Sequence, residues 1–233
     1  MNNSIEILST RPYAAALIDE AAELGITIHE LSFITTEPID DLSILQEIQT
    51  TFTLQATVVF TSMNAVEAVA DQLLGFKPEW KIYCIGSTTR QLVEKYFGTD
   101  SIAGTAASAG ALAELIAAES PVNELIYFCG NIRRDELPQI LQEHGFEVDE
   151  IAVYQTTLIP RKIVKDYHGI LFFSPSAVES FFKLNKAASH TVFFAIGSTT
   201  AAAIRNYSDN KIITTDTQSK EEMLERVKEY FCG

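Results

Sequence analysis

Short apolar runs recur along the chain, and each is followed by a small polar or glycine-containing segment and then by an amphipathic stretch. Short apolar runs without alternation are typical of strands that are buried on both faces of a sheet. The stretches that follow have helical spacing, as with Leu92, Val93, Tyr96 and Phe97. Alternating strands and helices predict a parallel sheet with right-handed crossovers. The clearest strand-like runs are TVVF at 57–60, KIYCI at 81–85, GILFF at 169–173 and TVFFAI at 191–196.

The pattern occurs twice in the chain. CIGSTT at 84–89 returns as AIGSTT at 195–200, and the similarity extends through three successive strand–helix units. These units share one spacing with a single-residue slip, so the sequence predicts two similar α/β domains. The corresponding positions are Ser62 and Ser174 at an offset of 112, Gly86 and Gly197 at 111, and Leu112 and Leu224 at 112.

The two copies are completed differently. The first copy continues into a fourth strand, a helix closed by Gly145 and a fifth strand, whereas the second copy stops at the C-terminus. The elements that the second copy lacks are predicted near the N-terminus, as a strand, a helix closed by Gly25 and another strand. We therefore expect a discontinuous domain of residues 1–34 plus 157–233, with residues 38–152 inserted as the second domain. Two connectors, near 32–38 and 152–158, would form a paired hinge beside a cleft.

Composition narrows the classes of function. The chain has 233 residues, of which 47% are apolar, and no uninterrupted apolar run of about 18 residues that would span a membrane. Its first residues lack the features of a signal peptide, so we expect a soluble cytoplasmic protein. A net charge of -14 argues against nucleic-acid binding. A local cluster of donors can still bind a small anion, because exposed charges are screened beyond about 8 Å at physiological salt.

Familiar site motifs are missing from the sequence. The four histidines have no HxxxH or HxH spacing, and the three cysteines are scattered, which predicts reduced thiols without a metal site. Neither GxGxxG nor GxxxxGK[ST] occurs, and there is no GxSxG turn. We therefore expect no metal, no nucleotide cofactor and no serine-hydrolase triad.

Several polar residues have the spacing of helix starts. Asn64 with Glu67, and Ser176 with Glu179, match the first and last positions of a capping box, and we expect each pair to begin a helix. The threonine pairs 88–89 and 199–200 are further candidates for caps. Capping and ligand binding are compatible, because the helix end that needs a cap also presents free N–H groups to an anion.

Small hydroxyl residues and glycines follow the predicted strands. In parallel α/β sheets, ligands bind beyond the carboxyl ends of the strands. We therefore expect a polar, anion-binding surface on each domain, suited to a large ligand with many carboxylates. Its members are Ser9, Thr10, Thr61, Ser62, residues 87–89, Gly130, Asn131, Ser174 and residues 198–200.

Taken together, these motifs resemble the uroporphyrinogen-III synthase family. Each motif is degenerate alone, but their order and spacing are specific and span nearly the whole chain. The motifs are TRP at 10–12, FTSMNAV at 60–66, CIGSTTRQLVEKYFG at 84–98, CGNIRRDELPQILQEHGFEVDEIAVYQT at 129–156, FFSPSAVESF at 172–181 and AIGSTTAAAI at 195–204.

The resemblance implies two α/β domains joined by a two-strand connector, and a cofactor-free reaction. In that reaction hydroxymethylbilane, a linear tetrapyrrole with eight carboxylates, loses water, inverts its ring D and closes to uroporphyrinogen III in haem biosynthesis. The family mechanism passes through an azafulvene cation and a spiro intermediate. The resemblance also favours a monomer, and it leaves open a direct transfer of the substrate from hydroxymethylbilane synthase.

The resemblance also carries residue roles. Tyr154 matches the family's tyrosine near the connector, which assists departure of the hydroxyl; packing of the hinge by this aromatic ring is the alternative. Asn64 stands where some members carry arginine, and SPS at 174–176 replaces the more usual threonine–serine start. Arg133 and Arg134 are further candidates for carboxylate binding. The expected substrate-binding residues are Arg11, Ser62, Asn64, Gly86, Thr89, Gly130, Ser174, Ser176, Gly197, Thr199 and Thr200.

Two other functions remain open from the residues alone. A two-domain glycosyltransferase would also have a polar cleft, but it needs a nucleotide-sugar site, and the sequence offers no motif for one. A hinged binding protein for a small polyanion would have a similar architecture and would bind its ligand without converting it.

Overall fold

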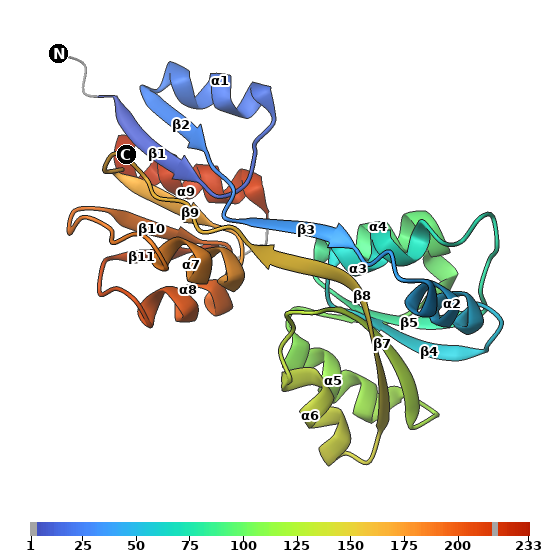
Figure 1. The fold of residues 1–233 in the computed structure, drawn as a ribbon. Helices are drawn as coiled ribbons and strands as arrows, with labels where there is room; N and C mark the ends of the chain where they lie inside the picture. The colour runs from blue at the N-terminus through green and yellow to red at the C-terminus, as the bar shows by residue number, and fades with distance from the viewer. Residues whose placement is uncertain (1–3, 216–218) are drawn as a thin grey trace. The chain divides into compact units, whose positions relative to one another are not determined.

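The computed structural model describes residues 4–215 and 219–233, apart from the side chain of Ser87, so the start of the expected first range, residues 1–3, lies outside the described residues. The chain divides into two compact units. Unit 1 joins the N-terminal residues through Thr35 to the residues from Thr157 onward, and unit 2 comprises Thr36–Thr156. In Figure 1, unit 1 therefore carries both ends of the colour range and unit 2 carries the middle.

Unit 1 contains a five-stranded sheet in the order β11-β10-β9-β1-β2, and every described pair of neighbours is parallel. The N-terminal strand β1 pairs with β9, more than 150 residues later in the chain (Figure 1). Through this pairing the N-terminal segment and the residues from Thr157 onward share one sheet. The strands are β1 (Ile5–Ser9), β2 (Ile26–Glu30), β9 (Gly169–Phe172), β10 (Val192–Ala195) and β11 (Ile212–Thr214).

Helices cover both faces of this sheet. Helices α7 (Pro175–Phe182) and α8 (Ser198–Arg205) pack on one face around Phe172 and Phe193. Helices α1 (Ala15–Glu23) and α9 (Lys220–Cys232) pack on the other face around Leu171 and Phe194. Because consecutive residues point to opposite faces, a strand covered on both sides needs a continuous apolar run, as the sequence has here.

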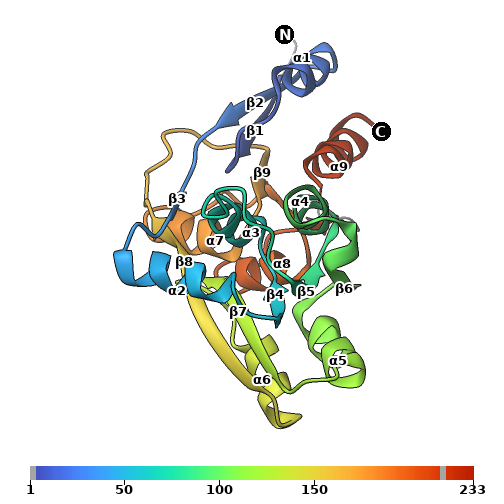
Figure 2. The same cartoon turned by 90° about the vertical axis from the view of Figure 1, so that its right-hand side faces the viewer.

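Unit 2 contains a six-stranded sheet in the order β3-β8-β7-β4-β5-β6. Helices α2 (Leu42–Thr51), α3 (Met63–Ala70) and α4 (Ser87–Phe97) cover one face, and α5 (Ala109–Glu119) and α6 (Glu136–Glu143) cover the other (Figure 2). A short 3-10 helix, Thr99–Ser101, precedes β6. The strands are β3 (Ile34–Pro38), β4 (Ala56–Phe60), β5 (Trp80–Ile85), β6 (Ile102–Ala106), β7 (Glu124–Gly130) and β8 (Glu147–Leu158).

The two sheets share one strand order, which confirms the internal repeat. The order β8-β7-β4-β5-β6 in unit 2 corresponds to β2-β1-β9-β10-β11 in unit 1. In unit 2 the chain runs outward from β4 to β6 and then returns to the other side of β4 to form β7 and β8. The direction of winding therefore changes between β4 and β7. Such a switch point is where open α/β sheets bind ligands, beyond the carboxyl ends of the strands.

The segments in which the chain passes between the units are β-strands. β3 and β8 are neighbours in the sheet of unit 2. The amide of Ile39 donates to the carbonyl of Val153 at 3.0 Å, and that of Ile159 donates to the carbonyl of Phe33 at 2.8 Å. The residue numbers run in opposite directions along this ladder, so the two strands are antiparallel. The expected two-strand connector is therefore formed by regular β-pairing.

Gly25 and Gly145 end helices as the sequence predicts. They follow the C-terminal residues of α1 and α6 and have φ angles of 78° and 82°. This left-handed backbone is available to glycine at no steric cost.

We expect Gly145→Ala to lower the free energy of unfolding by about 1–2 kcal/mol, because a Cβ in this conformation approaches the carbonyl oxygen. Urea unfolding followed by circular dichroism measures the change. Gly145→Asn is the matched control and should lose less, since asparagine tolerates this conformation. An equal loss in both variants would show that the backbone angle is not the cause.

Candidate functional site

The capping residues differ from those that the sequence suggested. Ser62, not Asn64, caps α3, and its side chain accepts a hydrogen bond from the amide of Asn64 at 3.2 Å. Ser174, not Ser176, caps α7, and its hydroxyl accepts from the amide of Ala177 at 3.2 Å. The expectation for Asn64 and Ser176 was therefore wrong. An extended residue followed directly by the helix was available two positions earlier, and both Ser62 and Ser174 have that backbone conformation.

We expect Ser174→Ala to lower the free energy of unfolding by about 0.5–2 kcal/mol, because the amide of Ala177 loses its partner. Ser176→Ala is the control and should change stability much less, since its hydroxyl caps no helix. Chemical denaturation of the two variants distinguishes these positions. A larger loss for Ser176→Ala would contradict the assignment of the cap.

Glycines begin the next helix of each unit. Gly86 caps α4 and Gly197 caps α8, and neither residue has a side chain that could occupy the N–H groups of the first turn. Gly86 has a φ angle of 72° and a ψ angle of 170°, which favours glycine. Free N–H groups at a helix N-terminus can bind an anion.

The threonines after these glycines do not cap the helices, contrary to the expectation. Thr89 and Thr200 lie in the first turn of α4 and α8, and only 7% and 2% of their surface is exposed. Thr199 is half-buried beside Thr200.

Tyr154 lies directly over Gly130. A Cβ built on Gly130 would come within 2.5 Å of Cζ and 2.8 Å of the hydroxyl oxygen of Tyr154. Tyr154 faces Gly130 because the register between β7 and β8 shifts at Cys129 and Gly130. The ring of Tyr154 thus packs directly against the backbone of Gly130, which has no side chain. This contact brings together two residues that the sequence had selected separately.

Asn64 and Tyr154 line the same pocket, which has a volume of about 280 Å³. One wall is formed by Asn64, Glu67 and Ala68 of α3 and by Asp71, the C-cap of that helix. Residues 36–38 and Tyr96 complete the lining. Three carboxylates therefore surround this pocket, from Glu37, Glu67 and Asp71. They favour a neutral or cationic group over a carboxylate at this point.

In unit 1, Arg11 has a second cation in its vicinity. Lys220, at the start of α9, donates from Nζ to the carbonyl of Pro12 at 2.8 Å. Burial lowers the pKa of Lys220, and the positive charge of Arg11 lowers it further. Sequence analysis missed Lys220, because it lies more than 200 residues from Arg11 in the chain. Two cations held near each other favour the binding of an anion.

Arg133 is held by acidic side chains of its own unit. Its guanidinium donates to the carboxylate of Glu150, and to that of Asp135 at 3.1 Å. Hydrogen bonding to Glu150 raises the pKa of Arg133. These partners offset its charge, which makes Arg133 a weaker candidate for carboxylate binding than the sequence suggested.

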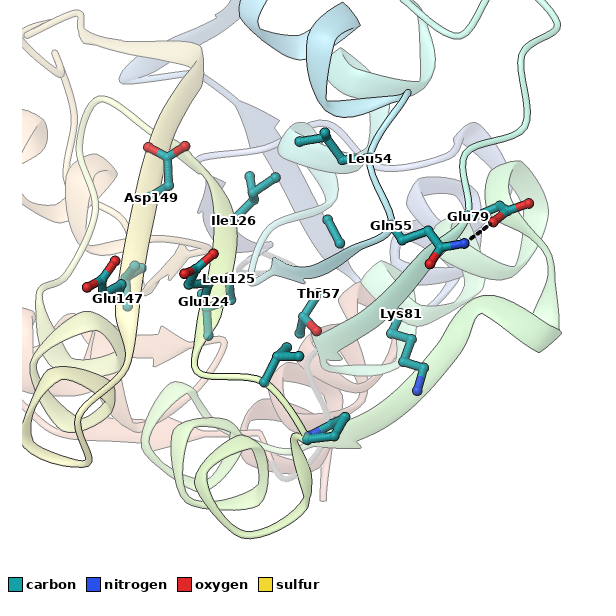
Figure 3. Close-up of a pocket in the computed structure, with 14 residues that line it drawn as sticks. Leu54, Gln55, Thr57, Glu79, Lys81, Glu124, Leu125, Ile126, Glu147 and Asp149 are labelled. Atoms are coloured by element: carbon teal, nitrogen blue, oxygen red, sulfur yellow. Dashed lines mark hydrogen bonds between the residues drawn. The ribbon is translucent and has the colours of Figure 1, made fainter.

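Another pocket of unit 2, about 880 Å³, lies at the opposite end of the strands from Asn64 and Tyr154. It is formed at the amino-terminal ends of β4, β5, β7 and β8, and none of the expected site residues lines it. Glu124 and Glu147 face each other across adjacent strands, with Asp149 beside them (Figure 3). Glu79 adds a fourth carboxylate, against one cation, Lys81. This negative lining does not suit a substrate with many carboxylates.

The buried cysteines are unreactive thiols. Burial raises the pKa of both Cys84 and Cys129 to about 11, so both are protonated at neutral pH. All three cysteines are free. Within residues 4–215 and 219–233, no group of three or more His, Cys, Asp or Glu side chains is placed to hold a metal ion. Over the same residues, no helix is both long and apolar enough to cross a membrane.

Comparison with known proteins gives one family. The model of the family "Uroporphyrinogen-III synthase HemD" matches residues 15–225. A uroporphyrinogen-III synthase from Chlorobaculum parvum is 26% identical over 220 residues, which cover 85% of this chain and 87% of that protein.

Solved structures share the fold. A mutant uroporphyrinogen III synthase from Thermus thermophilus aligns with a TM-score of 0.70 at 15% identity and covers 97% of this chain and 98% of its own. The uroporphyrinogen-III synthetase from Helicobacter pylori aligns with a TM-score of 0.62 at 17% identity and covers 97% and 99%. Since the family model matches most of the chain, this protein belongs to the uroporphyrinogen-III synthase family.

Proposed function

We propose that the protein converts hydroxymethylbilane to uroporphyrinogen III, with inversion of ring D and loss of water, and that the carboxyl-end surfaces of units 1 and 2 bind this substrate. Membership of the uroporphyrinogen-III synthase family is the observation that carries the function. Such an enzyme is a cyclising lyase of tetrapyrrole biosynthesis. In this proposal, units 1 and 2 are the two domains of the enzyme.

Backbone donors bind most of the substrate's carboxylates. The helix N-termini after Gly86 and Gly197 have glycine caps, so their first N–H groups have no competing side-chain oxygen from the cap. The hydroxyls of Ser62 and Ser174 each accept one hydrogen bond at a helix start, and their O–H groups can donate to the substrate. Ser176, Thr89, Thr199 and Thr200 lie in the same helix starts and support these donors.

Arg11 and Lys220 form the cationic part of the binding surface. Their mutual repulsion is relieved when a carboxylate binds between them, which adds to the affinity for an anionic substrate. The contribution is local, because it acts against a net charge of -14 for the whole chain.

Tyr154 assists the departure of the hydroxyl group in this mechanism. The C–O bond of the hydroxymethyl group breaks, the pyrrole nitrogen supplies the electrons, and the oxygen leaves as water after taking up a proton. The phenol of Tyr154 donates a hydrogen bond to the leaving oxygen from the 280 Å³ pocket. Asn64 and Gly130 complete this end of the site, Gly130 by seating the ring of Tyr154.

The charge of the same pocket supports the intermediate. Departure of the hydroxyl leaves a cationic azafulvene, and Glu67 of α3 lines the pocket that contains Tyr154. A fixed negative charge near a developing cation stabilises the transition state. The carboxylates of the pocket also keep the acetate and propionate groups of the reacting ring outside it. Positioning and charge complementarity thus do the catalytic work without a nucleophilic triad.

The proposed function extends to the oligomeric state of the enzyme, its compartment and the source of its substrate. We propose that it acts as a monomer in the cytoplasm and receives its labile substrate from hydroxymethylbilane synthase. Gel filtration at several protein concentrations tests the monomer.

The isomer of the product tests the function directly. Purified protein is supplied with freshly generated hydroxymethylbilane, and the product is oxidised and separated by chromatography. Hydroxymethylbilane closes unaided to the type I isomer, so a type III product reports enzyme action. Type I alone, from folded protein, would contradict the synthase and favour a hinged protein that binds a small polyanion.

A further inference from the structure

A partly buried hydrogen bond joins β7 to the residue that follows β4, at the switch point of unit 2. Tyr127 of β7 lies opposite Val59 of β4 in the parallel register. Thr61 is two residues beyond Val59, so its side chain is on the same face of the sheet. The phenol of Tyr127 reaches forward to it, and the two hydroxyl oxygens are 2.7 Å apart.

The side chain of Tyr127 lies in the core of unit 2. Its side chain is 3% exposed and packs with Val59, Leu137 and Leu141. Burial raises the pKa of Tyr127 to about 12, so the phenol is neutral over the working range of pH. Most buried polar side-chain atoms have a hydrogen-bond partner, and Thr61 supplies one for the phenol of Tyr127.

Thr61 in turn holds the start of α3. It immediately precedes Ser62, the N-cap, and α3 carries Asn64 and Glu67 into the pocket of Tyr154. At the end of β7, toward its other neighbour β8, the ring of Tyr154 packs against Gly130. Strand β7 therefore holds both walls of the pocket, one through the bond from Tyr127 to Thr61 and one through a close contact.

Unit 1 ties its corresponding strands in another way. Thr10, which follows β1, donates from its hydroxyl to the carbonyl of Leu171 in β9 at 2.8 Å. There the bond joins a side chain to the backbone and needs no aromatic residue. The phenol is thus a feature of unit 2 alone among the described strand pairs at the two switch points, and it lies beside the pocket that contains Tyr154.

We infer that Tyr127 is a positioning residue for ring closure: through Thr61 it holds the N-terminus of α3 at the geometry that the reaction at Tyr154 requires. The inference rests on the proposed site at Tyr154. Tyr127 does not itself contact the substrate in this role, because it is covered by the core.

Tyr127→Phe tests the role, with Tyr83→Phe as its matched control. Tyr83 is also a buried tyrosine of the same core cluster, at 4% exposure, and its hydroxyl makes no hydrogen bond to a described residue. We expect Tyr127→Phe to lower kcat about three- to tenfold, the scale of one lost hydrogen bond. We also expect a larger share of type I product and a KM close to that of Tyr83→Phe, while the thermal midpoint falls by about 2–4 °C relative to Tyr83→Phe because one hydrogen bond is lost.

Variants at Thr61 test the route of the effect. Thr61→Val should lower kcat at least as much as Tyr127→Phe does, and Thr61→Ser, which keeps the hydroxyl, should restore it. In the double variant the two losses should not add, because each removes the same bond. Additive losses, or equal kcat and product ratio in Tyr127→Phe and Tyr83→Phe, would overturn the inference.

Different experiments test the inference about Tyr127 and the proposed role of Tyr154. Full turnover in Tyr154→Phe would remove Tyr154 from the mechanism. The comparison of Tyr127→Phe with Tyr83→Phe, and the coupling to Thr61, would still decide whether the bond between Tyr127 and Thr61 positions α3.

Discussion

Tyr154→Phe lowers kcat about 10- to 100-fold while the protein stays folded, if Tyr154 donates to the departing hydroxyl. The estimate follows from the loss of one hydrogen bond to a group that becomes charged, which is worth about 1.5–3 kcal/mol. The ring remains over Gly130, so its packing is preserved. Single-turnover measurement of ring closure, with the ratio of type III to type I product, gives the effect.

The control for this variant is again Tyr83→Phe, which removes a phenol from the same unit without touching the pocket. Circular dichroism and the thermal midpoint should be the same for both variants. Unchanged turnover in Tyr154→Phe would mean that Tyr154 serves the packing of the strand end only. A matching loss in Tyr83→Phe would show that the effect is structural.

Gly130→Ala lowers both stability and turnover. The added methyl group would lie 2.5 Å from the ring of Tyr154, a distance at which the ring or the strand must shift. We expect the free energy of unfolding to fall by about 1–3 kcal/mol, as for other overpacked positions. Displacing a positioned group by about 1 Å can cost about 100-fold in rate, so kcat should fall on this scale.

A second substitution separates the two effects of Gly130→Ala. Adding Tyr154→Leu removes the ring that the methyl group meets, so stability should recover while turnover stays low. Gly197→Ala is the control for stability, because no atom of the described residues lies within 4 Å of a Cβ there and its φ angle of 173° is open to any residue. If Gly130→Ala has the stability of Gly197→Ala, the close contact with Tyr154 is not what requires glycine at position 130.

Several features of the fold were predictable from the sequence. The apolar runs at 57–60 and 169–173 became central strands, β4 and β9, because runs of this kind are buried on both faces. The offset between Gly86 and Gly197 predicted equivalent helix starts, and both residues are N-caps. Gly25 and Gly145 ended helices where the sequence placed them. The order of the motifs was sufficient to recognise the family, because order and spacing can be read from the sequence alone.

The helix starts show where local patterns fail. Ser62 and Asn64 are both good N-cap residues, and so are Ser174 and Ser176. The choice between them depends on where the preceding strand ends and on which residue is extended there. The sequence analysis did not predict helix α2. Asp41 caps this helix, and its side chain accepts hydrogen bonds from the amides of Ser43 and Ile44.

Only the tertiary structure decided how the candidate residues meet. Tyr154 faces Gly130 because one additional residue of β8 shifts the register, and Tyr127 reaches Thr61 because β7 returns to pair with β4. Arg11 and Lys220 act on each other because the two ends of the chain form one unit. Sequence by itself determined the elements, their repetition and the family, since these follow from local patterns and their spacing. The contacts within the site followed from strand order and register, which are set by pairing between segments far apart in the chain.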